Sequence, residues 1–228
     1  MTITLITGAN KGIGHEAARQ LVELGHTVYV GARDRVRGER AAAELGAEFV
    51  QLDVTDDESV SAALATIDRA HGRLDVLVNN AGTLGDGTSD PRVAAEVFDV
   101  NAVGVVRVTE AALPLLRRSE QAVVVNVSSS MGSFWAVTNP ERVESGLAAP
   151  LYAASKAATT MLTVQYAKAE PGIRFNAVEP GFTATDMTAA MGGGRDVAVS
   201  AKVVVAMATI GPDGPTGTLS DEAGPLPW

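Results

Sequence analysis

Tyr152 and Lys156 are the two residues of this sequence whose types and spacing most readily support chemistry. They lie four positions apart in the stretch LYAASKAATTML, so on a helix both side chains project from one face, one turn apart. A phenol is a weak acid with a pKa of about 10, but a neighbouring cation favours its ionised form. The pair predicts a group that donates and accepts a proton. Taken alone, the pair is better explained as part of a solvated helix face.

The elements that must position this pair follow a regular alternation. Short apolar, β-branched segments, expected to be strands, alternate with longer segments of helical apolar spacing. The expected strands are 3–7, 27–31, 47–52, 75–79, 122–127, 173–178 and a short one near 216–219, and the expected helices are 13–24, 35–45, 56–70, 92–118, 151–169 and 197–208. The alternation predicts a single α/β domain over 1–228, a doubly wound, Rossmann-like fold with helices on both faces of a seven-stranded, mostly parallel sheet. Such sheets bind ligands beyond the carboxyl ends of their strands.

Composition narrows the classes of function. The 228 residues include no cysteine and three histidines, and the net charge is −9. Disulfides and thiolate chemistry are therefore excluded, and a structural zinc site is disfavoured. The negative charge argues against a nucleic-acid surface, and no apolar run reaches the roughly 18 residues that span a bilayer. Because the first residues also lack the basic region of a signal peptide, we expect a cytoplasmic protein.

A glycine-rich turn, TGANKGIG, joins the first expected strand to the first expected helix. Glycines allow tight turning and close backbone approach, and a helix N-terminus offers free N–H groups to a phosphate. The spacing differs from the usual G-x-G-x-x-G fingerprint, and the Gly-Lys-Ser/Thr ending of a P-loop is absent. The turn predicts phosphate binding without nucleotide hydrolysis.

The end of the second expected strand supports two interpretations. Asp34 lies 20 residues after Gly14, where an acid can hold a ribose 2′-hydroxyl and select NAD. Arg33 comes directly after the small Ala32 and can instead pair with a 2′-phosphate, with Lys11 as a second cation. We favour the second interpretation, and therefore NADP(H).

Polar or small residues also follow the later strands. Asp53 can accept from an adenine amino group, and the Asn79–Gly82 turn can pack beside a cofactor, with Asn80 in a structural role. Hydroxyls follow the fifth strand at Ser128–Ser130 and the sixth in the stretch Pro180–Thr185. No acid–histidine pair accompanies these serines, which excludes a Ser-His-Asp hydrolase.

Together these motifs resemble the short-chain dehydrogenase/reductase family. They occur in the family's order, as TGANKGIG (7–14), NNAG (79–82), Asn101, SSS (128–130), YAASK (152–156) and PGFTAT (180–185). The opening motif, the SDEAGPLPW ending and the terminal Trp228 look more like the NADPH-dependent carbonyl reductase branch than the acyl-carrier-protein reductases. The resemblance implies an oxidoreductase that transfers a hydride between NADPH and a small-molecule ketone or aldehyde.

The resemblance also implies the role of each site residue. Tyr152 would protonate the carbonyl oxygen, and Lys156 would lower the pKa of Tyr152 and hold the nicotinamide ribose. Asn101 would anchor a water that relays protons, and Ser129 would polarise the carbonyl, with Ser128 and Ser130 as the nearest alternatives. The implied cofactor-binding residues are Gly8, Asn10, Lys11, Gly12, Ile13, Gly14, Arg33, Asp53, Val54, Asn79, Ala81, Gly82, Tyr152, Lys156, Pro180, Gly181, Thr183 and Thr185.

The sequence departs from the family pattern in two segments. The 23 positions from Ser129 to Tyr152 exceed the common spacing, and the extra residues fall in 131–150, which carries Phe134 and Trp135. The substrate lid, 186–198, is short and contains three consecutive glycines. We expect these two loops to form the walls of the substrate site. Monomer and homo-oligomer both remain open.

Two other functions share these motifs. An alcohol dehydrogenase of the same fold would work in the oxidative direction. A catalytically silent, NADP-binding regulatory protein would keep the cofactor site, although such a protein is expected to lose the tyrosine or the lysine, and this chain has both. The motifs do not identify the substrate.

Overall fold

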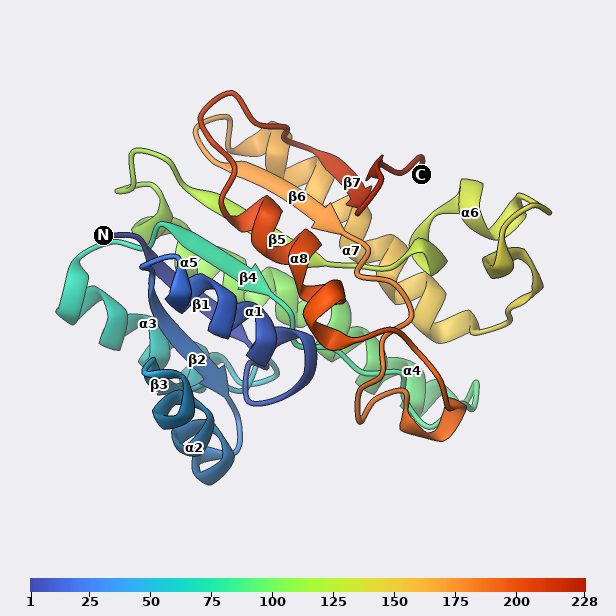
Figure 1. Ribbon diagram of the computed structural model, residues 1–228, viewed down its shortest axis with the longest axis horizontal. Coiled ribbons are helices and arrows are strands. Elements are labelled where there is room, and N and C mark those ends of the chain that lie inside the picture. Colours follow the sequence, from blue (N-terminus) through green and yellow to red (C-terminus); the bar gives the residue numbers. More distant parts are fainter.

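The computed structural model describes every residue from Met1 to Trp228, and its strands form one sheet. The spatial order is β3-β2-β1-β4-β5-β6-β7-β8 (Figure 1). All neighbouring strands are parallel except the last pair, β7 and β8. The strands are β1 (Ile3–Thr7), β2 (Thr27–Ala32), β3 (Glu48–Gln51), β4 (Val76–Asn79), β5 (Val123–Val127), β6 (Arg174–Val178), β7 (Thr218–Asp221) and β8 (Gly224–Pro225).

The expected doubly wound fold is confirmed, with one strand more than expected. The additional β8 has only two residues, which is too short for an alternating pattern to indicate it. The order of strands reverses between β1 and β4, because β2 and β3 continue on one side of β1 and β4 to β7 on the other. Such a reversal opens a crevice at the carboxyl ends of the strands.

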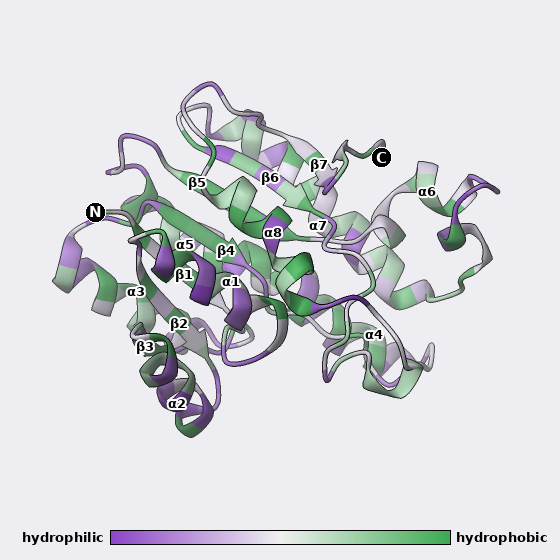
Figure 2. Ribbon diagram, in the orientation of Figure 1, coloured by the Kyte–Doolittle hydropathy of each residue, from purple (hydrophilic) through white to green (hydrophobic).

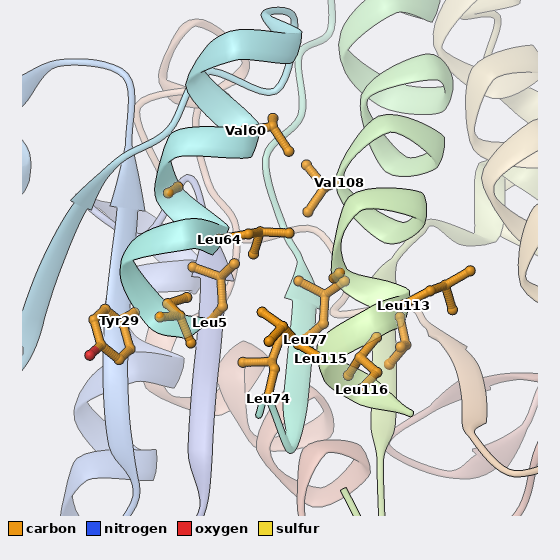
Figure 3. Packing of buried hydrophobic residues seen from close by; sticks show 14 of the residues in the cluster. Leu5, Tyr29, Val60, Leu64, Leu74, Leu77, Val108, Leu113, Leu115 and Leu116 are labelled. Carbon is orange, nitrogen blue, oxygen red and sulfur yellow. The ribbon is translucent and has the colours of Figure 1, made fainter. Parts of the chain in front are cut away.

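Helices cover both faces of the sheet. One face carries α1 (Gly12–Glu23), α2 (Arg35–Leu45) and α8 (Val197–Ala208), and the other carries α3 (Asp57–His71), α5 (Gly104–Leu116) and α7 (Pro150–Ala169) (Figure 1). Each face buries a cluster of 21 hydrophobic residues. Figure 3 shows leucines and valines from α3, α5 and the strands between them meeting in the first cluster. The hydrophilic residues lie mainly on helices and loops, while the central strands are hydrophobic (Figure 2).

Aspartates begin several of the helices. The side chains of Asp34, Asp56, Asp90 and Asp196 each accept a hydrogen bond from a backbone N–H in the first turn of the following helix. Such caps satisfy donors that have no partner within the helix. The helix that Asp56 caps also has an acidic first turn, with Asp57 and Glu58 following the cap.

The expected helix over 92–118 is divided into three parts. It consists of α4 (Pro91–Phe98), a π-helical turn at Asp99–Val103 and α5. The wider turn places Asn101 at its centre, buried and hydrogen bonded to a neighbouring loop. Such π turns are frequent at functional sites, and the apolar spacing of the sequence did not indicate this one.

The loop 131–150 contains helical structure that the sequence did not indicate. It holds a short helix, α6 (Phe134–Thr138), which lies between 3-10 turns at Ser130–Gly132 and Val143–Gly146. In Figure 1, α6 and α4 stand at the same end of the molecule, beyond the carboxyl ends of the strands. None of the helices combines the length and the apolar character that a membrane span requires.

Candidate active site

The turn between β1 and α1 is shaped by glycine. Gly8 and Gly12 have φ angles of +64° and +60°, a conformation that side chains disfavour. A Cβ at Gly8 would also lie 3.0 Å from the Cα of Ala81. The turn therefore lies against the end of β4 with its backbone accessible, and the N-terminus of α1 follows directly. This is the geometry expected of a phosphate-binding loop.

Asn80 locks this turn to the neighbouring strand. Its amide donates to the carbonyls of Thr7 at 2.8 Å and Gly8 at 3.2 Å, and the Thr7 hydroxyl accepts from the backbone N–H groups of Asn80 and Ala81. Gly14 provides the space, because a Cβ there would lie 2.3 Å from the Asn80 amide nitrogen. The structural role expected for Asn80 agrees with these contacts.

Asn79 requires a correction to the expected set of cofactor contacts. Its side chain is buried and donates to the hydroxyl of Thr109 at 3.1 Å and to the side chain of Asn126 at 2.8 Å. The amide therefore joins β4, β5 and α5 inside the protein. The side chain of Asn79 therefore points into the protein, and only its backbone is left for the edge of the crevice.

The contacts at the end of β2 decide between the two interpretations given for Arg33 and Asp34. Asp34 caps α2, since its carboxylate accepts from the backbone N–H of Arg37 at 3.0 Å and lies 3.6 Å from the guanidinium of that residue. Arg33 is exposed and pairs with no carboxylate. Lys11, expected as the second cation, instead forms an ion pair with Asp186 at 3.0 Å. Arg33 and Arg37 are thus the cations at this strand end.

Asp53 and Val54 follow β3 as expected. One carboxylate oxygen of Asp53 accepts from the backbone N–H and the hydroxyl of Thr55. Burial raises the pKa of Asp53, but these bonds outweigh it and hold the pKa below its usual value. The other oxygen makes no hydrogen bond within the protein, so it can accept from a ligand. Val54 is buried against Gly104, just after the π turn.

The start of α7 packs closely on the residues that follow β5. The hydroxyl of Ser128 donates to the backbone carbonyl of Lys156 at 3.1 Å and also contacts Thr160. Gly132 permits this approach, because a Cβ there would lie 2.5 Å from the backbone of Lys156. The close packing brings the Ser128–Ser130 segment to the face of α7 that carries Tyr152.

The three serines make different contacts. Ser128 is used in packing, and the backbone N–H of Ser130 donates to the carboxylate of Glu179. The Ser129 hydroxyl accepts from the N–H of Met131 and lies near enough to Tyr152 to lower the pKa of the phenol in part. Of the three, Ser129 is therefore the one that the structure brings to the phenol.

Lys156 is buried beside the cofactor turn. Its ammonium donates to the carbonyl of Val127 at 2.7 Å and lies 5.7 Å from the ring centroid of Tyr152. A Cβ at Gly82 would lie 3.5 Å from the same nitrogen, so this glycine leaves the ammonium open on one side. Burial lowers the pKa of Lys156 to about 8, while the charge of Glu179 acts in the opposite direction. The side chain remains mainly cationic at neutral pH.

The pKa of Tyr152 differs from the expectation. Burial and then the negative charge of Glu179 raise the pKa to about 12, and the hydrogen bond with Ser129 lowers it only in part. We expected Lys156 to depress this pKa. Since the ammonium is directed at the carbonyl of Val127 and an anion lies nearby, the phenol is instead strongly held in its protonated form.

Asn101 lies between the π turn and α7. Its side chain exchanges hydrogen bonds with the backbone of Thr83 and donates to the hydroxyl of Ser155 at 2.9 Å. Its backbone carbonyl accepts from Thr159 at 2.8 Å. A Cβ at Gly82 would lie 3.4 Å from its side-chain oxygen, so Asn101 and Lys156 flank the same glycine.

The segment after β6 folds back toward the glycine-rich turn. Thr183 is buried and bonds to Gly181 and Ser200. A Cβ at Gly12 would lie 3.4 Å from the methyl group of Thr185. The carbonyl of Pro180 accepts from the guanidinium of Arg195 at 2.9 Å. The motif residues at 180–185 therefore lie across the crevice from α1, as the cofactor expectation requires.

The loop 131–150 is fixed by a buried ion pair. Arg142 donates to both carboxylate oxygens of Glu144, at 2.8 and 3.1 Å, and stacks 5.4 Å from the ring centroid of Trp135. The side chain of Ser130 also contributes to lowering the pKa of Glu144. The ion pair therefore lies beside the serines that follow β5.

Large apolar side chains are exposed on both sequence segments expected to line the substrate site. Phe134 and Trp135 are exposed on α6, and Phe182, Met187 and Met191 follow β6. Exposed apolar groups concentrated at a crevice are typical of ligand-binding surfaces.

Sequence reasoning missed two residues at this edge. Arg37 lies in the first turn of α2, four residues after Arg33, and a second arginine close behind the end of the strand was the signal that could have indicated it. Glu179 ends an apolar strand directly before Pro180, and its carboxylate is buried between the serines and Gly181. A carboxylate at the end of a buried strand was its signal.

Comparisons with known proteins agree with this geometry. The family model described as short chain dehydrogenase matches residues 2–195. The chain is 32% identical to (−)-isopiperitenone reductase of Mentha piperita, with 93% of this chain and 94% of that protein covered. It is 35% identical to the 3-oxoacyl acyl-carrier-protein reductase FabG of Staphylococcus aureus, with 82% and 76% covered.

A solved structure, the NADPH-bound carbonyl reductase from chicken fatty liver, superimposes with a TM-score of 0.85 at 26% identity over the full length of both chains. The expected likeness to carbonyl reductases is confirmed by this match. The family match covers the glycine-rich turn, the serines, the Tyr152–Lys156 pair and the Pro180–Thr185 segment together. This chain therefore belongs to the short-chain dehydrogenase/reductase family of oxidoreductases.

Proposed function

We propose that this protein reduces a ketone or aldehyde with NADPH and that Tyr152 donates the proton. The observation that carries the proposal is the meeting of Tyr152, Ser129 and Lys156 at the carboxyl end of β5. This end lies beside β4, whose following turn is joined to the glycine-rich loop. A proton donor therefore stands next to a surface suited to a dinucleotide.

The residues of the crevice fit a dinucleotide. Gly8 and Gly12 have positive φ angles and no side chains, so only backbone lies in a space that a side chain would otherwise fill. Helix α1 begins at this point. Arg33 and Arg37 are suited to a 2′-phosphate, because guanidinium groups pair with phosphate oxygens through two parallel bonds. The NADPH in the similar chicken structure supports the same choice for this chain.

NADPH supplies the hydride, and the protein positions the carbonyl and supplies the proton. The hydroxyls of Ser129 and Tyr152 would both donate to the carbonyl oxygen, where negative charge develops. Tyr152 then transfers its proton to that oxygen. The Lys156 ammonium, 5.7 Å from the ring centroid of Tyr152, would hold the nicotinamide ribose beside the phenol. Asn101 would hold the water through which the proton is replaced.

The apolar side chains on the two loops support a hydrophobic carbonyl compound as substrate. Phe134 and Trp135 would contact it from one side and Phe182 and Met187 from the other. The similar Mentha protein is named as a reductase of isopiperitenone, which supports a small-molecule substrate. Methionines adapt to different shapes, so we expect several ketones of this class to be accepted.

Replacement of Tyr152 tests the proposal. We expect Tyr152→Phe to lower kcat for NADPH-dependent reduction about 100-fold to 10,000-fold, the range typical of a lost general acid. NADPH oxidation followed across a panel of cyclic, aromatic and aliphatic ketones measures the effect, and cofactor binding by fluorescence is the control. Undiminished turnover would refute the role of Tyr152. Cofactor binding without turnover of any carbonyl by the wild type would favour a regulatory protein.

A further inference from the structure

Arg195 lies where the loop after β6 returns to the sheet, and it takes no part in the proposed proton transfer. Its backbone pairs with the cofactor segment. The N–H of Arg195 donates to the carbonyl of Phe182 at 2.9 Å, and its carbonyl accepts from the N–H of Ala184 at 3.0 Å. A Cβ at Gly194 would lie 2.5 Å from the nitrogen of Ala184, so glycine is needed for this approach. The two ends of the loop 185–193 are therefore joined to each other.

The guanidinium of Arg195 reaches further back along the same segment. Its ε-nitrogen donates to the carbonyl of Pro180 at 2.9 Å, and a second nitrogen donates to the same oxygen. The ε-nitrogen also contacts the hydroxyl of Ser200 at 3.1 Å, and that hydroxyl lies 2.6 Å from the hydroxyl of Thr183. The third nitrogen pairs with Glu222 at 2.9 Å. One side chain therefore ties Pro180 to α8 and to the turn between β7 and β8.

Gly181 is shaped for this contact. Its φ angle is +80°, and a Cβ there would lie 2.7 Å from the central carbon of the Arg195 guanidinium. The guanidinium therefore lies directly against the backbone of Gly181, and only 27% of the Arg195 side chain is exposed. Hydrogen bonds from charged donors are stronger than those from neutral donors. The turn at Pro180–Thr183 is thus held by a charged donor in a mostly buried position.

The place of this turn along the sheet indicates which part of the cofactor it meets. Arg33 follows β2, the glycine-rich turn follows β1, and Lys156 bonds to the end of β5. The strands lie in the order β3-β2-β1-β4-β5-β6. A dinucleotide with its 2′-phosphate at Arg33 and its pyrophosphate at the glycine-rich turn therefore has its nicotinamide end near β5 and β6. The Pro180–Thr183 turn directly follows this part of the sheet.

We propose that Arg195 is a positioning residue that holds the Pro180–Thr183 turn in the shape that receives the nicotinamide end of the cofactor. The bonds of Arg195 also separate this turn from the loop 185–193, which exposes Met187 and Met191. The loop can therefore adapt to a substrate without moving the turn. The inference rests on the proposed function, because it concerns how the cofactor of that reaction is held.

Replacement by glutamine removes the charge and keeps a polar side chain. In Arg195→Gln the carbonyl of Pro180 loses its charged donor, so the turn no longer has one fixed shape. We expect NADPH to bind about threefold to tenfold more weakly, the loss of one hydrogen bond. The fragment 2′-phospho-ADP-ribose, which is the cofactor without its nicotinamide, should bind as tightly as it does to the wild type. The fluorescence lifetime of bound NADPH should shorten, because a nicotinamide that rotates more freely loses its excited state faster.

Two further variants and a matched control grade the effect. Arg195→Lys keeps one charged donor, so its losses should be smaller than those of Arg195→Gln. Glu222→Gln removes an ion-pair partner that is 59% exposed, and it should have the smallest effect. Arg118→Gln is the control, because Arg118 also binds a carboxylate and a backbone carbonyl, those of Asp68 and Gly72, but lies before β5 at the amino ends of the strands. It should leave all three measurements unchanged.

Thermal unfolding of each variant shows whether it is folded. Equal losses of affinity for NADPH and for 2′-phospho-ADP-ribose in Arg195→Gln would overturn the proposal, since they would indicate a general disturbance of the fold. Unchanged NADPH affinity and lifetime in the Arg195 variants would overturn it as well. If Arg195→Gln does not fold, Arg195→Lys decides by the same measurements. If the wild type reduces no carbonyl, the proposed function fails, while the binding comparison still decides the role of Arg195.

Discussion

The two sides of the crevice are built in different ways. The cofactor side, at the ends of β1 and β4, is shaped by glycines and by amide and hydroxyl bonds to the backbone, as at Gly14 and Asn80. The substrate side, after β5 and β6, is fixed by charged side chains such as Arg142 with Glu144. Its large apolar residues Phe134, Phe182 and Met187 are exposed, whereas Ala9 on the cofactor side is buried and Ile13 partly so.

This difference teaches how one fold can keep a cofactor and change a substrate. The cofactor side is held by bonds to backbone atoms, whose positions the strands fix. The shape of the cofactor side therefore tolerates few changes. Ion pairs between loop side chains can be exchanged for other pairs without disturbing the strands. We therefore expect changes on the two sides to separate cofactor binding from turnover.

The largest expected effect is on the free energy of unfolding and concerns Glu144, on the substrate side. Its bond to Arg142 lowers the pKa of Glu144 from 4.5 to about 2 against the opposing effect of burial. A carboxyl group whose pKa is lower in the folded protein stabilises the fold at pH values above its pKa in the unfolded protein. This stabilisation is lost as the pH falls from 4.5 toward 2. The shift corresponds to about 3 kcal/mol at neutral pH.

We expect Glu144→Gln to reduce the free energy of unfolding by up to about 3 kcal/mol at pH 7 and by progressively less below pH 4.5. Denaturant unfolding of both proteins from pH 2.5 to 7 measures the difference. Cofactor affinity should stay within twofold of the wild type, since the cofactor side is untouched. A pH-independent difference would contradict the ion-pair explanation.

A pair of glycine variants compares the two sides directly. In Gly132→Ala the new Cβ would meet the backbone of α7 at 2.5 Å, and in Gly14→Ala it would meet the bonded Asn80 amide at 2.3 Å. Overpacking of this kind costs about 1–3 kcal/mol. We expect Gly132→Ala to lower kcat while keeping NADPH affinity, because Ser129 moves relative to Tyr152.

Gly14→Ala should do the reverse and mainly weaken NADPH binding. Steady-state kinetics and fluorescence titration of both variants provide the comparison, with thermal unfolding as the control for stability. Equal losses of affinity in the two variants would show that the sides of the crevice are not independent.

The smallest expected effect concerns the choice of cofactor. We expect Arg33→Ala to weaken NADPH binding about tenfold, the loss of one charge-assisted bond, and to leave NADH binding unchanged. Arg35→Ala is the control, because Arg35 is also exposed in this region but pairs with Glu39. Affinities for both cofactors, measured at two salt concentrations, test this. NADH bound as tightly as NADPH by the wild type would rule out the role of Arg33.

The fold followed from the sequence where periodicity and composition were strong. The β-branched segments gave seven strands within two residues of their observed bounds, and α2 and α8 begin and end where expected. The π turn at Asp99–Val103 could not be anticipated, because it depends on Asn101 reaching the Thr83 loop from a distant part of the chain. Helix α6 was missed because its five residues are too few for a helical period.

The sequence predicted which residues belong to the proposed site. The helical spacing of Tyr152 and Lys156, the glycine-rich turn and, for Ser129, the family resemblance were the basis of that prediction. They did not reveal that Asn79 faces inward or that Lys11 pairs with Asp186. Side-chain direction depends on neighbours far away in the chain, and a motif does not contain that information.

What the sequence determined by itself was the order of elements, the edge of the sheet where we propose the site and the proposed acid–base pair four residues apart on one helix. Only the tertiary structure decided the protonation of that pair. The spacing places a cation beside the phenol. Burial and the carboxylate of Glu179, which follows a different strand, nevertheless raise the pKa of the phenol. Electrostatic effects depend on distance and solvent exclusion in three dimensions, and neither is fixed by spacing along the chain.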